Sequence, residues 1–361
     1  MRVALVTPEF PGCGPSYGVG QYGSALARGL AERGAEVLVL TADGGGGHAI
    51  APGEPPRRDA TWSCPAVLTP LRAAPWLTSS LERWQPEVVE FANWGGLGAW
   101  VRGPWTTVVR LSTSVHAIRP GSPLRRAAQQ LHFASEARTV AKARRLIAHS
   151  GAMAVLGQRL YRRRTDYVIP LPWSGQRLVA DVLSDDVLFV GRLEHRKGID
   201  VLLAAWRLVR RQDRRAQLHL VGADHDGFGA RALSIWGSDG VVVHGRLEEP
   251  DLMALRARCR IQVVPSRYES FGLTALEAWG AGLAVVASDT GGLSEVVDDA
   301  GLLVPPGDAR ALSTAILRLL ADRRLCAKLA EQGVERLPLH TVQRCAELTL
   351  AAYASARTRG I

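Results

Sequence analysis

The sequence has few cysteines, few lysines and no long apolar run. Its five cysteines form no Cys-x-x-Cys pair and are odd in number, so neither a disulfide framework nor a zinc site is expected. No stretch of 18 or more apolar residues is free of charge, and the first residues already have the pattern of a strand. We therefore expect no membrane span and no signal peptide, and a cytoplasmic protein.

The 361 residues are more than one ordinary hydrophobic core supports, so two domains are expected. The net charge of +10 is unevenly divided, because residues 1–180 contain 21 Lys and Arg against 11 Asp and Glu, whereas residues 181–361 contain 23 of each. The excess fits either a solvated arginine-rich surface, which is the simpler interpretation, or a peripheral contact with an anionic membrane. We expect no nucleic-acid partner.

Apolar strands alternate with helical segments along both halves of the chain. The predicted strands are residues 3–6, 37–40, 88–91, 107–111 and 146–148, then 187–190, 218–221, 241–243, 261–264 and 284–287. Between the two sets, residues 168–172 have the pattern of a linker. This alternation predicts two doubly wound parallel sheets. We place the first domain at residues 1–175, the second at 176–338, and a last helix that packs back on the first at 339–361.

Two glutamates, Glu269 and Glu277, flank a seven-residue stretch in the second half. Residues 261–264 predict a buried strand and residues 274–280 a helix, so Glu269 lies at the exit of the strand and Glu277 on the helix. The backbone N–H groups of Phe271, Gly272 and Leu273 then lie at the helix N-terminus. There they lack intrahelical acceptors and favour an anion such as a phosphate.

Two cations follow the first predicted strand of the second half, in the segment GRLEHRKG. Arg192 can bind a phosphate through two N–H groups, and Lys197 adds a point charge. Lysine occurs at only three positions among 44 basic residues, which makes Lys197 conspicuous. Taken alone, an ordinary charged loop explains the segment equally well. The glutamates at a parallel strand end favour a diphosphate site.

Two other motifs suggest different chemistry. Gly18, Gly20 and Gly23 satisfy the Gly-x-Gly-x-x-Gly pattern and, with Asp43, would suggest an NAD-dependent oxidoreductase, but eleven residues separate the first strand from Gly18. The Asp-x-Asp pattern at residues 224–226 is typical of metal-dependent transferases, but it follows a strand of the second domain, where an exposed polar loop is simpler. We therefore expect no metal ion and no cofactor.

The segments together resemble the retaining, nucleotide-sugar-dependent glycosyltransferases of family four, also called group 1. The resemblance rests on GRLEHRKG and ESFGLTALEAWGAGLAVVASDTGGLSEVV, and more loosely on PEFPGCGPSYGVGQYGSALARGLAERGAEV, LSTSVH and GLLVPPGDARALSTAILRLL. It implies the GT-B fold, an α/β architecture in which two Rossmann-like, doubly wound parallel-sheet domains face a cleft. In this fold a C-terminal helix crosses back to the first domain.

The resemblance also implies roles for single residues. Arg192 and Lys197 would bind the diphosphate of the donor, Glu269 would contact the hydroxyls of the transferred sugar, and Glu277 would accept hydrogen bonds from the ribose. The further donor contacts would be Gly18, Gly20, Leu247, Phe271, Gly272 and Leu273. His116, which as a lone histidine would be structural, would touch the sugar. Aromatic faces suit sugar rings, so the acceptor candidates are Tyr17, Trp94 and His116.

The expected reaction transfers a sugar from a nucleoside diphosphate sugar, with a UDP-sugar as first choice and a GDP-sugar as second, and retains the configuration of the anomeric carbon. Negative charge grows on the leaving diphosphate, where Arg192 and Lys197 would stabilise it. His116 and Glu269 would position the sugar. We expect a small soluble acceptor, such as a specialised-metabolite intermediate. The alternatives are a lipid- or polysaccharide-directed enzyme at a membrane surface and a non-catalytic sugar-nucleotide-binding protein.

Overall fold

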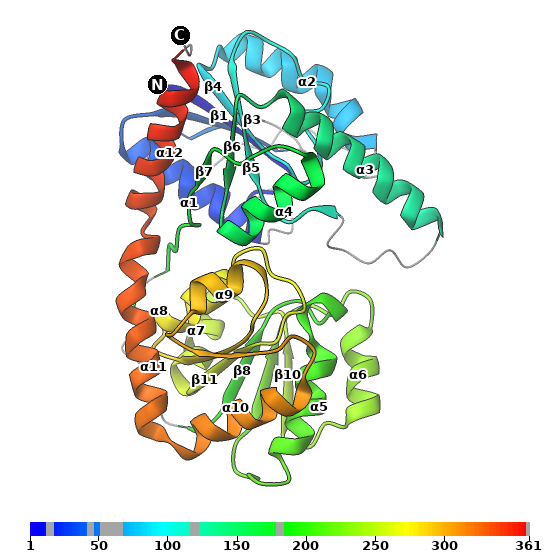
Figure 1. Cartoon of the computed structure of the whole chain (residues 1–361), viewed down its shortest axis with the longest axis vertical. Helices are drawn as coiled ribbons and strands as arrows, with labels where there is room; N and C mark the ends of the chain where they lie inside the picture. Colours follow the sequence, from blue (N-terminus) through cyan, green and yellow to red (C-terminus); the bar gives the residue numbers. More distant parts are fainter. Residues whose placement is uncertain are drawn as a thin grey trace. The chain divides into compact units, whose positions relative to one another are not determined.

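The computed structural model describes residues 1–11, 18–41, 47–50, 68–115, 123–175, 177 and 184–358. The chain divides into two compact units, of which unit 1 comprises Met1–Ser174 with His340–Ile361 and unit 2 comprises Gly175–Leu339 (Figure 1). Each unit is an α/β structure built around its own sheet. Within the described residues, no helix combines the length and the apolar character needed to cross a membrane.

The sheet of unit 1 has seven strands among the described residues, in the order β3-β2-β1-β4-β5-β6-β7. They are β1 Arg2–Thr7, β2 Glu36–Thr41, β3 Gly47–Ile50, β4 Val88–Ala92, β5 Thr106–Leu111, β6 Arg145–Ala148 and β7 Tyr167–Val168. Neighbours pair in parallel except β3, which is antiparallel to β2. The order reverses at β1, which pairs with both β2 and β4. In open α/β sheets such a reversal opens a crevice at the carboxyl ends of the strands.

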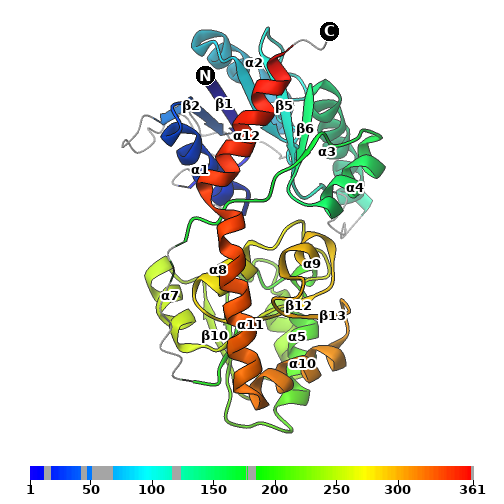
Figure 2. The ribbon, with the colours of Figure 1, turned by 60° about the vertical axis from the view of Figure 1, so that its left-hand side comes forward.

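Helices cover both faces of this sheet. Those of unit 1 are α1 Gly18–Glu32, α2 Thr69–Trp84, α3 Pro123–Lys142, α4 Gly151–Tyr161 and α12 Val342–Arg357. Helices α1 and α12 lie side by side (Figures 1 and 2). Gly29 makes this approach close, since a Cβ there would lie 2.7 Å from Val342 Cγ1 and 3.1 Å from Ala346 Cβ. The last helix of the chain is therefore part of the core of unit 1.

Residues 168–172 do not form a linker, so that prediction was wrong. Tyr167–Val168 forms β7, which pairs in parallel with β6, and Ile169 N donates a hydrogen bond to Ala148 O at 2.8 Å. Ile169 and Leu171 are buried in unit 1. The prolines of this segment, Pro170 and Pro172, suggested a break, but they follow β7, which ends at Val168, and the chain around them stays packed in unit 1. Further along the same segment, the backbone N–H of Trp173 donates a hydrogen bond to His340 O at 2.7 Å.

In the described part of unit 2, the sheet has six parallel strands in the order β10-β9-β8-β11-β12-β13. They are β8 Val187–Val190, β9 Leu218–Val221, β10 Val241–Gly245, β11 Ile261–Val264, β12 Ala284–Ser288 and β13 Leu302–Val304. The helices are α5 Ile199–Val209, α6 Phe228–Trp236, α7 Glu249–Arg258, α8 Leu273–Gly280, α9 Gly291–Val297, α10 Ala309–Ala321 and α11 Arg323–Arg336, with short 3₁₀ turns η3 His195–Lys197 and η4 Leu337–His340. The order reverses at β8, between β9 and β11. Both predicted sheets are therefore confirmed.

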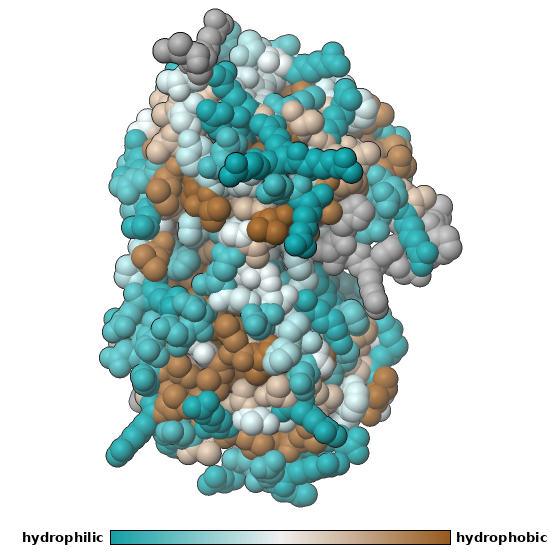
Figure 3. Space-filling model, viewed as in Figure 1, coloured by the Kyte–Doolittle hydropathy of each residue, from teal (hydrophilic) through white to brown (hydrophobic). Residues whose placement is uncertain are grey.

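On the face that Figure 3 shows, hydrophilic side chains lie between several groups of apolar ones (Figure 3). Among the described residues, the most exposed large apolar side chains are Ile235, Leu131 and Leu71, each more than half exposed. They belong to three different helices, α6, α3 and α2. Scattered apolar side chains of this kind are ordinary for a folded domain.

Candidate active site

The candidate site of unit 2 lies where the strand order reverses. Strand β8 ends at Val190 and β11 ends at Val264, and the two strands are parallel neighbours. The loops that follow them therefore leave the same edge of the sheet. One loop carries Arg192 and leads into η3, and the other carries Glu269. The topology thus brings together the two segments that the sequence singled out.

Glycines let the loops of this edge approach each other closely. Gly198 has φ 71°, and a Cβ there would lie 1.9 Å from the carbonyl oxygen of Pro265. Gly291 has φ 55°, and a Cβ there would lie 2.2 Å from the carbonyl oxygen of Glu269. Only glycine adopts both the positive φ and the contact without strain. The N–H of Gly292 also donates to Glu269 O at 3.0 Å, so the backbone at Glu269 is held from two sides.

Lys197 and Glu269, which we expected to contact different parts of a donor, form an ion pair. Lys197 Nζ donates to Glu269 Oε2 at 2.5 Å, and Arg196 Nη1 lies 3.9 Å from the same oxygen. The side chains of Lys197 and Glu269 are only 15% and 13% exposed. Burial by itself would raise the pKa of the Glu269 carboxyl, but Lys197 and Arg196 outweigh burial and hold that pKa below its ordinary value. Burial lowers the pKa of Lys197, and Glu269 opposes this.

Arg192 is the most accessible cation of this group. Its side chain is 39% exposed, and its Nη1 lies 3.2 Å from Glu194 Oε2. The other oxygen of Glu194 accepts a hydrogen bond from Arg196 Nε at 3.1 Å. Three cations and two carboxylates therefore share this edge, with one positive charge in excess. Sequence reasoning missed Arg196, because in a chain so rich in arginine its only signal was its place beside Lys197.

Helix α8 carries the second predicted glutamate. The helix begins at Leu273, one residue before the predicted start, and its N-cap residue is Gly272, which has no side chain that could cap it. Glu277 lies one turn further along, and its Oε2 accepts a hydrogen bond from Arg256 Nη2 of α7. The side chain of Arg256 is 3% exposed and that of Glu277 is 26% exposed. Arg256 was not among the predicted site residues, because no motif in its neighbouring sequence distinguishes it from other arginines.

The Asp-x-Asp segment has a structural role at the start of α6. Asp224 Oδ1 and Oδ2 accept hydrogen bonds from the backbone of Gly229 at 3.2 Å and Ala230 at 2.9 Å. A carboxylate at this position satisfies N–H groups that the helix leaves unpaired. His225 and Asp226 are exposed, as expected for a polar loop. Leu247, expected near the base of the donor, is half-buried in the loop after β10, and its contact with a base stays a prediction.

The predicted residues of unit 1 are only partly described. Gly18, Gly20 and Gly23 all lie inside α1, whereas the dinucleotide pattern needs its first glycine in the turn before the helix. Gly20 N donates to Glu9 Oε1 at 2.9 Å, so this N–H has an acceptor within unit 1. Trp94 is half-buried just after β4. Three further predicted positions lie outside the described residues: Tyr17, Asp43 and His116.

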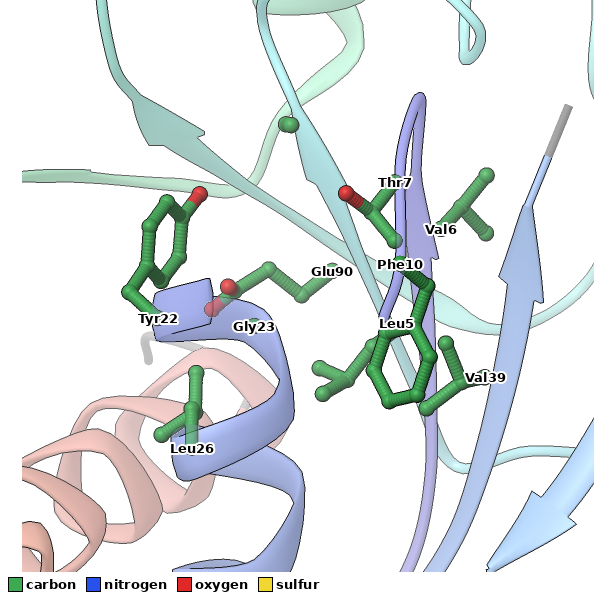
Figure 4. A pocket seen from close by; sticks show the side chains of 10 residues that line it. Leu5, Val6, Thr7, Phe10, Tyr22, Gly23, Leu26, Val39 and Glu90 are labelled. Carbon is green, nitrogen blue, oxygen red and sulfur yellow. The ribbon is translucent and has the colours of Figure 1, made fainter. Parts of the chain in front are cut away.

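A small cavity lies beside α1 in unit 1 (Figure 4). Its lining consists of Leu5, Val6, Thr7, Phe10, Tyr22, Gly23, Leu26, Val39, Glu90 and Ala92. The cavity measures about 20 Å³, which corresponds to roughly one water molecule. Glu90, its only charged lining residue, already binds Arg110 and Tyr353 through both carboxylate oxygens. This cavity is therefore a feature of the core of unit 1.

Two family patterns match the chain, one in each half. The family described as Glycosyltransferase Family 4 matches residues 17–172, and Glycosyl transferases group 1 matches residues 184–322. The O-antigen chain mannosyltransferase B of Escherichia coli is 34% identical over 173 residues, which are 46% of this chain and 45% of that protein. The chain spans less than half the length of the curated relatives that it matches.

Solved structures share the whole architecture at low sequence identity. A sucrose-phosphate synthase from Thermosynechococcus elongatus has a TM-score of 0.79 and 24% identity, covering 98% of both chains. The HepE protein of Anabaena, solved in complex with UDP and glucose, has a TM-score of 0.73 and 17% identity, covering 98% of this chain and 99% of that one. These similarities confirm the expected fold class. With both halves matched by glycosyltransferase patterns, the chain belongs to the GT-B glycosyltransferases of family four.

Proposed function

We propose that the chain is a retaining, metal-independent glycosyltransferase that moves a sugar from a nucleoside diphosphate sugar to a small soluble acceptor. The observation that carries this proposal is the cluster of Arg192, Arg196 and Lys197 with Glu194 and Glu269, at the point where the strand order of unit 2 reverses. Helix α8 begins four residues after Glu269, so its N-terminus lies at the same edge, where the helix dipole favours an anion. Family membership supports sugar transfer over other uses of such a site.

The cations suit the diphosphate of a donor. Arg192 is accessible enough to bind a phosphate through two N–H groups. Lys197 has three N–H donors and gives one to Glu269, so two stay available for a phosphate oxygen. As the bond between the anomeric carbon and the diphosphate breaks, negative charge collects on the leaving oxygen. Fixed positive charge near that oxygen stabilises the transition state more than the ground state.

The glutamates suit the hydroxyl groups of the donor. Glu269 is held ionised by Lys197 and Arg196, and an ionised carboxylate accepts hydrogen bonds from sugar hydroxyls. Glu277 would accept from the ribose in the same way. The Anabaena relative was solved with UDP and glucose, so a UDP-sugar is our first choice and a GDP-sugar our second. No separate cofactor takes part in this proposal.

The chemical step keeps the configuration of the anomeric carbon. The bond from that carbon to the diphosphate oxygen breaks, and the acceptor oxygen bonds to the same face of the sugar. The acceptor proton passes to the departing phosphate, so no protein base is required. The acceptor displaces the diphosphate in one step on the same face, so no protein nucleophile is required either. Glu269 and His116 would position the sugar for this step.

A panel of nucleotide sugars tests the donor site. UDP-, GDP-, ADP- and dTDP-sugars are compared by thermal unfolding, because a ligand at one hundred times its Kd adds about 2.7 kcal/mol of stability. We expect one base to stabilise the wild type, and Lys197→Met to lose most of this effect. Stabilisation by NADH alone would instead support an oxidoreductase. The anomeric configuration of the product, read by NMR, then tests retention, and undiminished transfer in EDTA tests independence from metals.

A lipid-linked acceptor is the second candidate, and one observation favours it. On unit 1, the guanidinium of Arg138 lies 4.3 Å from the ring centre of the exposed Trp100, and Leu131 of the same helix is also exposed. Aromatic, aliphatic and cationic side chains together suit the surface of an anionic membrane. Sedimentation with anionic vesicles distinguishes the two acceptors. Tight, salt-sensitive binding would contradict the proposal of a small soluble acceptor.

A further inference from the structure

Among the described residues, Glu277 is the only carboxylate that forms an ion pair with Arg256, a buried cation on α7. Its Nη2 donates to Glu277 Oε2, its Nη1 lies 3.8 Å from Met253 Sδ, and its Nε has no hydrogen-bond partner among the described residues. The side chain is 3% exposed. A guanidinium buried without a counter-ion is costly, so Glu277 neutralises Arg256 and Arg256 in turn holds that carboxylate in place.

The other oxygen of Glu277 is left available. The side chain keeps 26% of its surface exposed, and no hydrogen bond from the described part of the chain reaches Oε1. A carboxylate has about four acceptor positions, so one N–H from Arg256 leaves capacity for two hydroxyl groups. A free glutamate side chain samples many rotamers, whereas one anchored at Oε2 presents Oε1 in a fixed direction. Pre-ordering of this kind strengthens binding without adding a contact.

We propose that Arg256 is a positioning residue for the ribose of the donor. By binding Oε2 of Glu277, it orients the carboxylate so that Oε1 accepts hydrogen bonds from the ribose hydroxyls. This inference rests on the proposed function, in which Glu277 contacts the ribose. It assigns to α7 a part in distinguishing a ribonucleotide from a nucleotide that lacks a ribose hydroxyl.

The test compares UDP with 2′-deoxy-UDP by isothermal titration calorimetry. If GDP stabilises the protein more strongly than UDP, the guanosine pair is used instead. We expect the wild type to bind the ribonucleotide about tenfold more tightly than its 2′-deoxy form, which corresponds to about 1.4 kcal/mol. Arg256→Met should reduce this preference to below about threefold and leave the affinity for the 2′-deoxy nucleotide within about threefold of wild type, because the diphosphate contacts are unchanged.

Three further variants make the result specific. Arg258→Met removes an exposed arginine of the same helix and should leave the preference at its wild-type value. Arg256→Lys keeps the charge but loses the forked geometry, so it should fold and show a reduced preference even if Arg256→Met does not fold. In a Glu277→Ala background, Arg256→Lys should change the preference no further, because the two residues act as one unit.

Each contrary result has a distinct meaning. If the Arg256 variants weaken both nucleotides by the same factor, Arg256 is only structural and the inference is wrong. An increased preference for the ribonucleotide would show that Arg256 withholds Glu277 from the ligand, which also overturns it. A wild type that binds UDP and 2′-deoxy-UDP equally well refutes the ribose contact but leaves the diphosphate site standing. If the wild type binds none of the UDP-, GDP-, ADP- and dTDP-sugars of the panel, the proposed function itself fails.

Discussion

Unit 1 and unit 2 share the same order of strands around the point of reversal but use charge differently. In unit 2, Arg192, Arg196 and Lys197 lie after β8 at the carboxyl edge of the sheet, and the side chain of Arg192 is 39% exposed. In unit 1, the ion pair of Arg110 and Glu90 lies within the sheet, where the two residues are 0% and 5% exposed. The same topology therefore carries charge at the edge of the sheet in one unit and buries it within the sheet in the other.

The buried pair of unit 1 binds the last helix of the chain. Arg110 donates to both oxygens of Glu90, at 2.7 and 2.9 Å, and also to Thr349 Oγ1 at 3.0 Å. Tyr353 OH donates to Glu90 Oε2 at 2.8 Å. Burial alone would lower the pKa of Arg110, but Glu90 outweighs burial and raises it. Both Thr349 and Tyr353 belong to α12, so the charge of β4 and β5 serves to hold a helix.

The carboxyl edge of unit 1 carries a network of hydrogen bonds around a single buried acid. Glu136 of α3 accepts from Ser114 Oγ at 2.9 Å, from Tyr161 OH at 2.9 Å and from Val115 N at 3.3 Å. Burial raises the pKa of the Glu136 carboxyl to about 7, and these hydrogen bonds oppose the rise. Glu269 of unit 2, beside two cations, has its pKa shifted in the opposite direction. Both carboxyls are largely buried, and the cations beside Glu269 reverse the shift that burial produces at Glu136.

Removing Arg110 has the largest expected effect and tests whether unit 1 depends on its buried ion pair. Arg110→Met leaves Glu90 buried without a cation, and breaking a buried pair in this way costs about 3–5 kcal/mol of unfolding free energy. Urea unfolding monitored on unit 1 measures the loss. Arg33→Met, which breaks the more exposed ion pair with Glu347 between α1 and α12, is the control and should cost less than about 1 kcal/mol. If the two substitutions lowered the unfolding free energy equally, the buried ion pair of Arg110 and Glu90 would contribute no more to stability than an exposed one.

Glu136→Gln should change the pH dependence of stability. The carboxyl titrates near 4.5 in the unfolded chain and near 7 in the folded one, so the folded state binds more protons between these values and wild-type stability falls as pH rises. The loss is complete above pH 7 and amounts to about 3 kcal/mol. Glutamine does not ionise, so the variant should gain stability relative to wild type from pH 5 to pH 8. The exposed Glu331→Gln is the control, and a flat difference for Glu136→Gln would refute the raised pKa.

Lys197→Met should lower kcat/KM about a hundredfold, a loss of about 2.7 kcal/mol in transition-state stabilisation. The substitution removes a charge beside the leaving diphosphate and leaves Glu269 without its nearest cation. Steady-state kinetics with the donor found in the nucleotide panel measure the loss. Lys328→Met, at an exposed position of α11, should leave the rate unchanged. A loss of less than about tenfold at Lys197 would argue against its role at the diphosphate.

Gly198→Ala should cost about 2 kcal/mol through backbone strain and contact with Pro265. Gly227 is a matched control, because it also precedes a helix, with φ 63° and ψ 18° against φ 71° and ψ 27° at Gly198. A Cβ at Gly227 would meet only the end of the flexible Arg231 side chain, at 3.3 Å. Gly227→Ala therefore measures mainly the cost of the backbone conformation, about 1 kcal/mol. Thermal unfolding of both variants isolates the extra cost of the close approach. If the two costs are equal, the loop at Pro265 can accommodate a Cβ at Gly198, and the close contact in the structure does not restrict this position.

Much of the fold of both units could be predicted from local pattern. The predicted strands at residues 187–190 and 261–264 have the observed bounds, and the helix carrying Glu277 begins within one residue of the expected start. Alternation of apolar residues and helix-breaking glycines is a local signal, so it survives in a single sequence. The failure at residues 168–172 has the same origin. Its prolines are a local signal for a break, whereas the burial of Ile169 depends on a distant strand.

The sequence by itself determined the alternation of strands and helices, the two sheets, and the choice of Arg192, Lys197, Glu269 and Glu277, because each of these rests on residue type and spacing. Only the tertiary structure decided which charges meet. Lys197 and Glu269 are 72 residues apart and Arg256 and Glu277 are 21 apart, so each contact depends on strand order and helix packing. The tertiary structure likewise set the burial that raises the pKa of Glu136, and it brought to Glu269 the cations that outweigh its burial and lower its pKa.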